Sequence, residues 1–362
     1  MSRRIDTFLY QKEKSLWTKM LLFPLHLLSL PYGWAVRART LSYAIGLRNP
    51  KRLPCPVISI GNITVGGTGK TPLVMTLARF LRDKGFRVAI LSRGYKGKKT
   101  KNPLVSDGQV VFLSPEESGD EPHLMADTLK GIPVLVGKDR FINGQMAIQR
   151  FGVRGILLDD GYQHLQLHRD LNILLIDSNM GFGDHSLLPR GILREPLDHL
   201  SRADCFVLTK VEDPERCHHL ETELQKAYPS IQVFHSQYQT VGLVGPRGEW
   251  EELPTLKGKR VLAISGIANP HYFSFLLRKC GMRVIKEEFF PDHHFYTHKD
   301  LASIQKKSSG MDWVVTTEKD MLKFKDLNIG TLPFRALRIE VKIQEEEAFF
   351  KKVLEIFSDK GA

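Results

Sequence analysis

The chain has 362 residues, 42% of them hydrophobic and 25% charged, which is ordinary for a soluble globular protein. This length predicts two domains. Four scattered cysteines, none in a C-x-x-C pair, argue for a reducing compartment and against disulfides or a cysteine metal site. The net charge of +12 is concentrated near the start, where residues 1–52 hold ten Lys or Arg against two acidic residues.

An uncharged stretch of 17 residues, 20–36, follows this basic beginning. It lies at the lower limit for a membrane span and contains two prolines, and no small-residue cleavage site of a signal peptide follows it. Its basic flanks and three aromatic residues favour a helix lying in an anionic membrane surface. These aromatic residues are Trp17, Tyr32 and Trp34. A helix packed on the protein's own core and a true span stay open as alternatives. We assign 1–52 to a basic, apolar membrane-interface segment.

Residues 57–78, VISIGNITVGGTGKTPLVMTLA, predict a phosphate-binding loop between a strand and a helix. The glycines let backbone N–H groups converge on an anion, and the helix N-terminus adds a partial positive charge. Lys70 can reach the β- and γ-phosphates of a nucleotide, and the Thr71 hydroxyl can hold Mg²⁺. The alternative is a glycine-rich turn that binds nothing. The predicted nucleotide-binding residues are Thr64, Val65, Gly66, Gly67, Thr68, Gly69, Lys70 and Thr71.

This loop departs from the usual G-x-x-x-x-G-K-[ST] pattern, because Thr64 stands where glycine is expected. The remainder, G-G-T-G-K-T, is the variant written K-G-G-x-G-K-[ST], with Val65 in place of the leading lysine. ATPases that act as dimeric switches in protein or plasmid positioning carry this variant and form a rival class. They normally keep the leading lysine, which this chain lacks.

Strand-like and helix-like segments alternate through the following part of the chain. The strand-like runs are 57–60, 87–91, 134–136, 155–160, 172–177 and 205–210. Helix-like segments include 72–84, 121–130 and 140–151. This alternation predicts an α/β fold with the doubly wound, mostly parallel sheet of a P-loop NTPase. Ligands of such a sheet gather at the carboxyl ends of its strands.

The alternation breaks at 233–256, which predicts a two-stranded hairpin turning at Gly245-Pro246-Arg247-Gly248. A second α/β series follows, with strands expected at 260–266, 283–290 and 313–320 and helices near 270–280 and 298–308. We therefore predict a P-loop kinase domain at 53–232. The hairpin at 233–256 is a hinge, and 257–362 forms a smaller C-terminal α/β domain.

A second nucleotide signal is Ile156-Leu157-Leu158-Asp159-Asp160-Gly161. A buried strand that ends in aspartate fits a Walker B element, whose carboxylate meets Mg²⁺ directly or through water. Asp177 ends another apolar run but lacks a paired acid, so Asp159 is the first candidate and Asp160 the second.

Arginines and carboxylates cluster at the other predicted strand ends. They lie in Ser92-Arg93-Gly94-Tyr95, Gly119-Asp120-Glu121-Pro122, Arg140, Gly161-Tyr162-Gln163-His164 and 188–196. Each alone is explained as a cap, a turn or a solvated charge. Together at one sheet edge they predict phosphoryl transfer to an anionic substrate.

Seven ordered motifs resemble the tetraacyldisaccharide 4'-kinase family, the lipid A 4'-kinases of Gram-negative bacteria. They are PVISIGNITVGGTGK (56–70), SRGY (92–95), GDEP (119–122), LDDGYQH (158–164), LLPRGILREP (187–196), FPDHH (290–294) and TEKD (317–320). The resemblance implies ATP-dependent phosphorylation of the 4'-hydroxyl of a tetraacylated glucosamine disaccharide 1-phosphate at the inner face of the cytoplasmic membrane. The chain departs from the family at 183–186, where an Asn-Gly pair is usual, and at Arg190, where a small residue is usual.

Site roles follow from chemistry and from this resemblance. A sugar hydroxyl is a poor nucleophile, so a base must take its proton. The resemblance places a catalytic aspartate at Asp120, paired with His293 of the second domain. Thr71 and Asp159 would hold Mg²⁺, with Asp160 as the second acid. By resemblance Gln163 and Glu195 complete the metal shell. Substrate sugar and phosphate would be positioned by Arg93, Tyr95, Arg140, His164 and Arg194.

Several alternatives stay open. His294 and His298 lie four residues apart and could join a metal site, although no third ligand is evident. A kinase for a soluble sugar is a second rival class, against which the anchor-like N-terminus argues. The segment Thr209-Lys210-Val211-Glu212 matches only loosely the N-K-x-D motif that recognises guanine. The preference for ATP over GTP is therefore inferred from the family resemblance. We expect a lipid substrate and an anionic membrane surface as partners, no nucleic acid and no obligatory protein partner.

Overall fold

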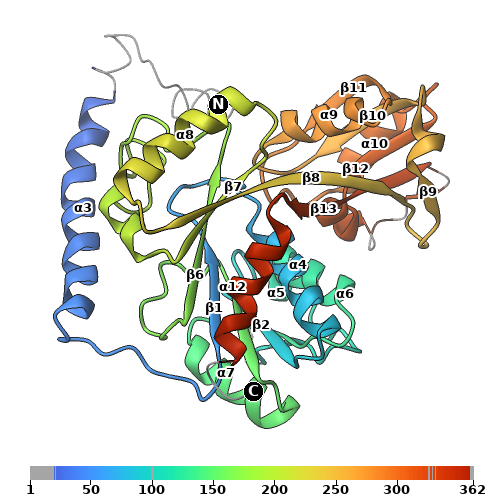
Figure 1. Cartoon of the computed structure of the whole chain (residues 1–362). Helices are drawn as coiled ribbons and strands as arrows, with labels where there is room; N and C mark the ends of the chain where they lie inside the picture. Colours follow the sequence, from blue (N-terminus) through green and yellow to red (C-terminus); the bar gives the residue numbers. More distant parts are fainter. Residues whose placement is uncertain are drawn as a thin grey trace.

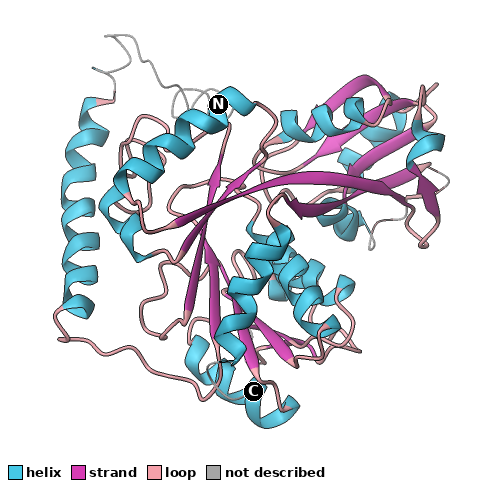
Figure 2. Cartoon of the chain, in the orientation of Figure 1, coloured by secondary structure: helices cyan, strands magenta, loops and turns pink. Residues whose placement is uncertain are grey.

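The computed structural model describes residues 20, 22–98, 102–324, 327, 329–330 and 332–358. Trp17 and the basic residues that precede it lie outside this part of the chain. In the described part, thirteen strands form one continuous sheet, with helices packed on its faces (Figures 1 and 2).

The first half of the chain forms a parallel sheet. In spatial order its strands are β7 (Cys205–Thr209), β6 (Leu171–Asp177), β1 (Val57–Gly61), β5 (Gly155–Asp159), β2 (Val88–Ser92), β4 (Val134–Val136) and β3 (Leu104–Ser106). Neighbouring strands run parallel except β3, which is antiparallel to β4. Its helices are α4 (Lys70–Asp83), α5 (Pro115–Ser118), α6 (Asp120–Thr128), α7 (Arg140–Phe151) and α8 (Pro214–Ala227). The expected doubly wound, mostly parallel sheet is confirmed.

Apolar residues on both faces of this sheet explain why its strands read as continuous hydrophobic runs. On one face, α4 buries Leu73, Leu77 and Leu81 in the cluster that contains Ile58 of β1. On the other face, Ala147 of α7 joins a second cluster. Each fully buried leucine stabilises the fold by about 1.5–3 kcal/mol relative to exposure. This packing fixes the start of α4, and with it the P-loop, over the carboxyl ends of the strands.

A long strand, β8 (Gln232–Val244), joins the two halves of the sheet (Figure 1). Its first residues, 232–235, pair parallel with β7, and residues from 236 onward pair antiparallel with β13 (Phe334–Ile343). The expected hairpin is present, because β9 (Trp250–Glu252) pairs antiparallel with the end of β8. Most of β8, however, pairs with β13, a partner that the sequence did not reveal.

The second half continues the sheet beyond β13 with β12 (Trp313–Thr317), β10 (Arg260–Ser265) and β11 (Arg283–Phe289), all parallel. Helices α9 (Pro270–Lys279) and α10 (His298–Lys307) follow the expected positions. The strand expected at 313–320 was too long. It ends at Thr317, whose side chain accepts the N–H of Asp320, so that residues 318–321 form the short helix α11 (Glu318–Met321).

The last helix, α12 (Glu346–Ser358), returns to the first half of the chain (Figure 1). Its Phe349, Phe350, Val353 and Phe357 belong to the same hydrophobic cluster as α4 and β1. The division at 53–232 and 257–362 stays a prediction, and the packing of α12 places the end of the second segment with the first.

Helix α3 (Phe23–Ala44) lies along the edge of the first half and buries only Ser29 and Gly33 (Figure 1). The Ser29 hydroxyl lies 3.1 Å from the carbonyl oxygen of Leu187, and the Tyr32 hydroxyl donates to the carbonyl of Arg194 at 2.7 Å. Large apolar side chains in and just after the helix stay exposed: Phe23, Leu27, Leu28, Leu30, Trp34, Leu41, Ile45 and Leu47. Among the described residues, no helix is long and apolar enough to cross a membrane.

Candidate active site

A cavity of about 960 Å³ opens at the carboxyl ends of the first-half strands and is closed from the other side by the second half of the chain. The segments that line it include α3, the P-loop, the ends of β2 and β5, residues 163–166, the loop at 188–195, the start of α9, residues 292–293, residues 317–319 and part of β13. Ligands bind at this edge in open α/β sheets. The predicted P-loop, Walker B acids and substrate residues therefore meet at one place.

The P-loop adopts a conformation that depends on glycine at two positions. Gly66 and Gly69 have φ angles of 107° and 89°, a region that side chains rarely enter. A Cβ atom at Gly69 would lie 2.5 Å from the Tyr238 hydroxyl oxygen. Thr64 instead forms a β-bridge with Leu193, so the position where the usual pattern has glycine lies in extended backbone here. The departure at Thr64 therefore leaves the loop intact.

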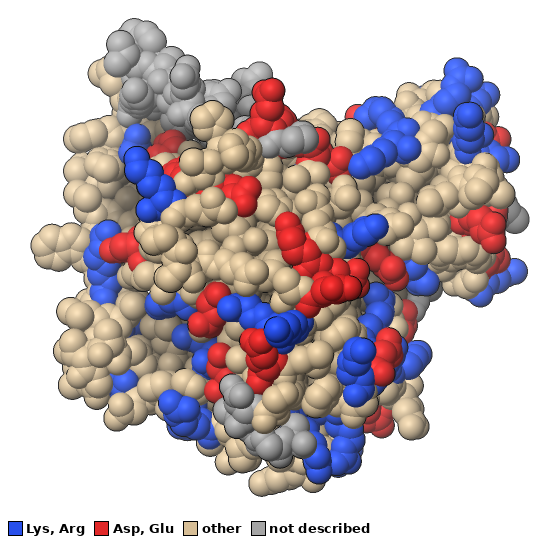
Figure 3. Space-filling view, in the orientation of Figure 1, with Lys and Arg blue, Asp and Glu red and all other residues tan. Residues whose placement is uncertain are grey.

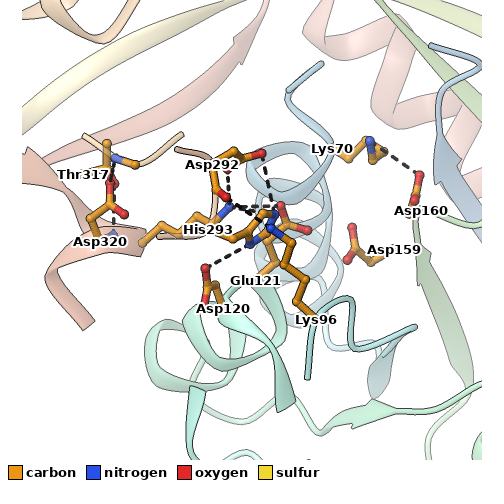
Figure 4. Close-up of polar contacts among 12 residues, drawn as sticks. Lys70, Lys96, Asp120, Glu121, Asp159, Asp160, Asp292, His293, Thr317 and Asp320 are labelled. Atoms are coloured by element: carbon orange, nitrogen blue, oxygen red, sulfur yellow. Dashed lines mark hydrogen bonds and ion pairs between the residues drawn. The ribbon is translucent and has the colours of Figure 1, made fainter. Parts of the chain in front are cut away.

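Lys70 opens α4 and is held toward the cavity by two oxygen atoms. Its Nζ donates to Oδ1 of Asn62 at 3.1 Å and lies 3.5 Å from Oδ1 of Asp160 (Figure 4). The Arg194 guanidinium binds the same carboxylate at 2.9 Å. Burial opposes ionisation of Asp160, but Lys70 and Arg194 outweigh it and hold the pKa of this carboxyl well below its usual range. Asp160 is therefore an anion paired to two cavity cations.

Asp159, in contrast, is buried with one oxygen free. Its Oδ2 accepts the Ser92 hydroxyl at 2.9 Å, while Oδ1 has no hydrogen-bond partner among the described residues. Burial, with the nearby Glu121 and Asp160 charges, raises the pKa of Asp159 to about 7. A buried carboxylate oxygen without a donor fits a bound cation, and the Thr71 hydroxyl lines the same cavity. This donor set suits Mg²⁺.

Gln163 and Glu195 also line the cavity, but both already have protein partners. The Gln163 side chain donates to the carbonyl of Asn62 at 2.8 Å. Oε2 of Glu195 lies 2.6 Å from Nδ1 of His199 and is bound by Arg202. Glu195 is thus a positioned, buried carboxylate, and the metal roles of Gln163 and Glu195 stay predictions.

The predicted pair of Asp120 and His293 is formed. The two residues are separated by 173 positions, and Nδ1 of His293 lies 3.0 Å from Oδ2 of Asp120 (Figure 4). Burial opposes ionisation of Asp120, yet the hydrogen bond with His293 and the charge of Lys323 outweigh it and lower the pKa of Asp120. His293 lines the cavity, whereas Asp120 is not among the described lining residues. The imidazole therefore faces the cavity, and the carboxylate supports it from behind.

The predicted substrate residues all line the cavity, but they differ in burial and in their contacts with the rest of the protein. Arg140 is buried and donates to the backbone carbonyl of Asp159 at 3.0 Å, so it also supports the end of β5. The Tyr95 ring is 60% exposed and lies 5.5 Å from the His293 ring. Burial, with the Arg140 charge, lowers the pKa of His164 to about 4, so this imidazole is neutral at pH 7 and suits a sugar hydroxyl. Arg93 is exposed on the cavity wall.

The described residues contain no group of three or more His, Cys, Asp or Glu that could hold a metal, and His294 pairs with Asp300 at 3.1 Å. The two departures from the family pattern contact each other, because the Arg190 guanidinium donates to the Ser186 hydroxyl at 3.0 Å. Lys210, which belongs to the segment compared with the N-K-x-D guanine reader, binds Asp177 and the P-loop backbone.

Two residues at this site, Asn62 and Lys319, had no predicted role. Asn62 orients Lys70, and Lys319 lines the cavity beside His293. Lys319 belongs to the TEKD motif, so the motif was a signal without an assigned role. Asn62 likewise belongs to the motif at 56–70, so it also had a motif signal without an assigned role.

Comparison with known proteins agrees with this geometry. Residues 19–358 match the family described as tetraacyldisaccharide-1-P 4'-kinase. The chain is 41% identical over 349 residues to a tetraacyldisaccharide 4'-kinase of Syntrophus aciditrophicus, covering 92% of this chain and 93% of the relative. It is 43% identical over 300 residues to that of Pelobacter propionicus, covering 82% and 81%.

A solved structure is also similar. This is the crystal structure of "apo" form LpxK from Aquifex aeolicus in complex with ATP, which matches with a TM-score of 0.74 and 35% identity. The match covers 93% of this chain and 99% of the Aquifex chain. The resemblance carried by the seven motifs is confirmed, and this chain belongs to the tetraacyldisaccharide-1-P 4'-kinase family.

Proposed function

We propose that this chain transfers the γ-phosphoryl group of ATP to the 4'-hydroxyl of a tetraacylated glucosamine disaccharide 1-phosphate. One observation carries the proposal: a P-loop lysine and a carboxylate–imidazole pair line or support the same cavity from opposite sides (Figure 4). A nucleotide bound at the P-loop presents its γ-phosphate toward the cavity. An acceptor hydroxyl beside His293 is then on the opposite side of that phosphate.

The proton of the acceptor hydroxyl goes to the pair of Asp120 and His293. As the sugar oxygen bonds to phosphorus, His293 Nε2 takes the hydroxyl proton and the leaving ADP oxygen keeps the electron pair of the broken bond. Asp120 accepts the Nδ1 proton in a hydrogen bond and stabilises the imidazolium that forms. Lys70 and Arg194 balance negative charge on the phosphoryl oxygens.

Thr71 and Asp159 would hold Mg²⁺, with Asp160, Gln163 and Glu195 around them. When bound, Mg²⁺ neutralises phosphate charge and orients the β- and γ-phosphates. The support for this assignment is the Asp159 oxygen without a donor. Arg93, Tyr95, Arg140, His164 and Arg194 would position the sugar and phosphate of the acceptor.

The lipid acceptor implies contact with a membrane surface, and α3 suits that contact. It carries several exposed apolar side chains, among them Trp34, which is 77% exposed. Arg37, which lies 3.6 Å from the carboxylate of Asp198, and Arg39 lie on the same helix. The edge of the molecule where α3 lies is mostly uncharged, with a few basic and acidic residues (Figure 3). Apolar burial combined with basic residues favours an anionic surface. We infer a peripheral position at the cytoplasmic face of the inner membrane, where ATP is available.

ATP turnover by the full chain, measured with and without the lipid disaccharide, tests this function against its rivals. We expect ADP to form only when the lipid 1-phosphate is present. A rate that depends on a soluble sugar would indicate a different acceptor. A rate that depends on protein concentration alone, with no acceptor, would indicate a dimeric switch ATPase.

A further inference from the structure

A buried lysine, Lys323, ties the Asp120 carboxylate to the second half of the chain. Its Nζ lies 2.9 Å from Oδ2 of Asp120 and 3.3 Å from Oδ1 of Asp320. Its side chain is 2% exposed, and the two carboxylates are 3% and 0% exposed. Asp320 is itself fixed, because Oδ2 accepts the Gly266 N–H at 2.8 Å and the Thr317 hydroxyl at 2.9 Å. Such a buried ion pair holds its members firmly, since an unpaired buried charge is costly.

A second lysine, Lys319, lies on the other side of the imidazole. Its Nζ lies 3.4 Å from Nε2 of His293 and 3.4 Å from Oδ1 of Asp292. Glu121 is 3.7 Å away. Burial disfavours the charge of Lys319, but Glu121 and Asp292 outweigh it and raise its pKa, so Lys319 is a cation. The imidazole therefore has a carboxylate at Nδ1, whereas at Nε2 the ammonium group of Lys319 at 3.4 Å is nearer than Oδ2 of Asp292 at 3.7 Å.

These charges specify the protonation state of the pair. The nitrogen beside a carboxylate carries a proton, whereas the nitrogen beside an ammonium group presents its lone pair. Lys323 already compensates the Asp120 charge, so the carboxylate does not require an imidazolium partner. We propose that Lys323 is a positioning residue that keeps Asp120 ionised and fixes His293 as the Nδ1–H tautomer, with the Nε2 lone pair available to the acceptor hydroxyl. Lys319 supports the same tautomer from the Nε2 side.

This inference deepens the proposed function and rests on it. Other charged or titratable groups around the pair also act on its titration. They are Asp292 at 3.7 Å from Nε2, Glu121 and Asp320, Lys96, which donates to the Asp292 carbonyl, Tyr95 against the imidazole, and Tyr296, whose hydroxyl group is near Asp120 and Asp320. These groups remain in every variant below, so a change between variants reports the lysine that was removed.

The test compares Lys323→Met and Lys319→Met with the wild-type full chain. Nitrogen NMR of histidine-labelled protein, with His293 identified by the loss of its signals in His293→Gln, reads the tautomer directly. We expect the Nδ1–H form in the wild type. Lys323→Met should increase the doubly protonated fraction at neutral pH severalfold. It should also move the acidic limb of the kcat profile to higher pH by about one unit or more, because a cation beside the pair is lost. A lysine that serves stability alone would leave both readouts unchanged.

Lys307→Met is the matched control, because Lys307 is paired with Glu288 at 2.6 Å in the same half of the chain. It should change neither readout. If Lys323→Met does not fold, Lys323→Gln, which removes the same charge but keeps a polar side chain, makes the same test in the same direction. A folded Lys323→Met or Lys323→Gln with wild-type His293 signals and a wild-type pH profile overturns the inference, and the same result for Lys319→Met removes only the supporting role of Lys319. The NMR readout needs no lipid turnover, so absence of turnover in the wild type would overturn the proposed function separately.

Discussion

Nζ of Lys210 lies 2.6 Å from the carbonyl oxygen of Gly67 in the P-loop and 2.5 Å from Oδ2 of Asp177. The neighbouring Thr209 hydroxyl donates to the Thr68 carbonyl at 3.0 Å. The end of β7 and the residue that follows it therefore hold the P-loop backbone in place. Asp177, the rival Walker B candidate, forms an ion pair with Lys210. Lys210 itself binds the backbone of the P-loop, so its contacts are not those of a residue that recognises a guanine base.

Lys210→Met should weaken both stability and nucleotide binding. Leaving Asp177 buried without its partner should lower the free energy of unfolding by about 3–5 kcal/mol. Denaturant unfolding and nucleotide titration measure the two effects. The double variant Lys210→Met/Asp177→Leu removes both charges, so it should recover much of the stability but not the nucleotide affinity. Recovery of affinity along with stability would show that the Gly67 contact is unimportant.

Asp159→Asn should raise the stability of the nucleotide-free protein but lower its activity. Burial and neighbouring acids raise the pKa of Asp159 to about 7, above the ordinary value near 4. Ionising Asp159 therefore lowers the stability of the nucleotide-free protein progressively as pH rises from about 4 to about 7, and the full loss persists at higher pH. We expect the variant to melt at a higher temperature than the wild type at pH 8, and by a smaller margin at pH 5. Turnover should fall by at least about 10²-fold. An unchanged rate would exclude Asp159 from metal binding.

Asp120 and His293 should behave as one unit. Asp120→Ala and His293→Ala should each lower kcat strongly, and the double variant should be little worse than the poorer single variant. ATP affinity should barely change, and the wild-type rate should rise with pH through the apparent pKa of the pair. Steady-state rates across pH check this prediction. Fully multiplicative losses would show that the two residues act independently, and a wild-type rate for His293→Ala would exclude the imidazole as the base.

The membrane prediction concerns the exposed face of α3. Trp34→Ser and Phe23→Ser should reduce binding to anionic vesicles, because both side chains are exposed on this helix. Trp250→Ser is the control, since Trp250 is 44% exposed in the second half of the chain. High salt should release part of the wild-type protein and detergent the rest. If the wild-type protein does not bind vesicles, α3 serves only as part of the fold.

Local patterns were enough to predict the parallel sheet, the P-loop and the position of Asp159 and Asp160 at a strand end, because apolar runs and glycines act within a few residues. The pair of Asp120 and His293 was predictable only through the family motifs. The pairing of β8 with β13 and the return of α12 depend on contacts between distant segments, which no periodicity reveals. Lys323 likewise has no local signature, since a lysine becomes a buried ion-pair partner only when the two halves meet.

The most direct test of the central claim is the mass of the lipid after purified protein is incubated with ATP, Mg²⁺ and the tetraacyldisaccharide 1-phosphate. Lys70→Ala is the control, because loss of its charge should lower the rate by at least about 10²-fold. We predict that the lipid gains one phosphoryl group, located at the 4'-oxygen, with one ADP formed for each. ADP formation with an unmodified lipid, or a phosphate at another position, would contradict the assignment of this cavity as a lipid 4'-kinase site.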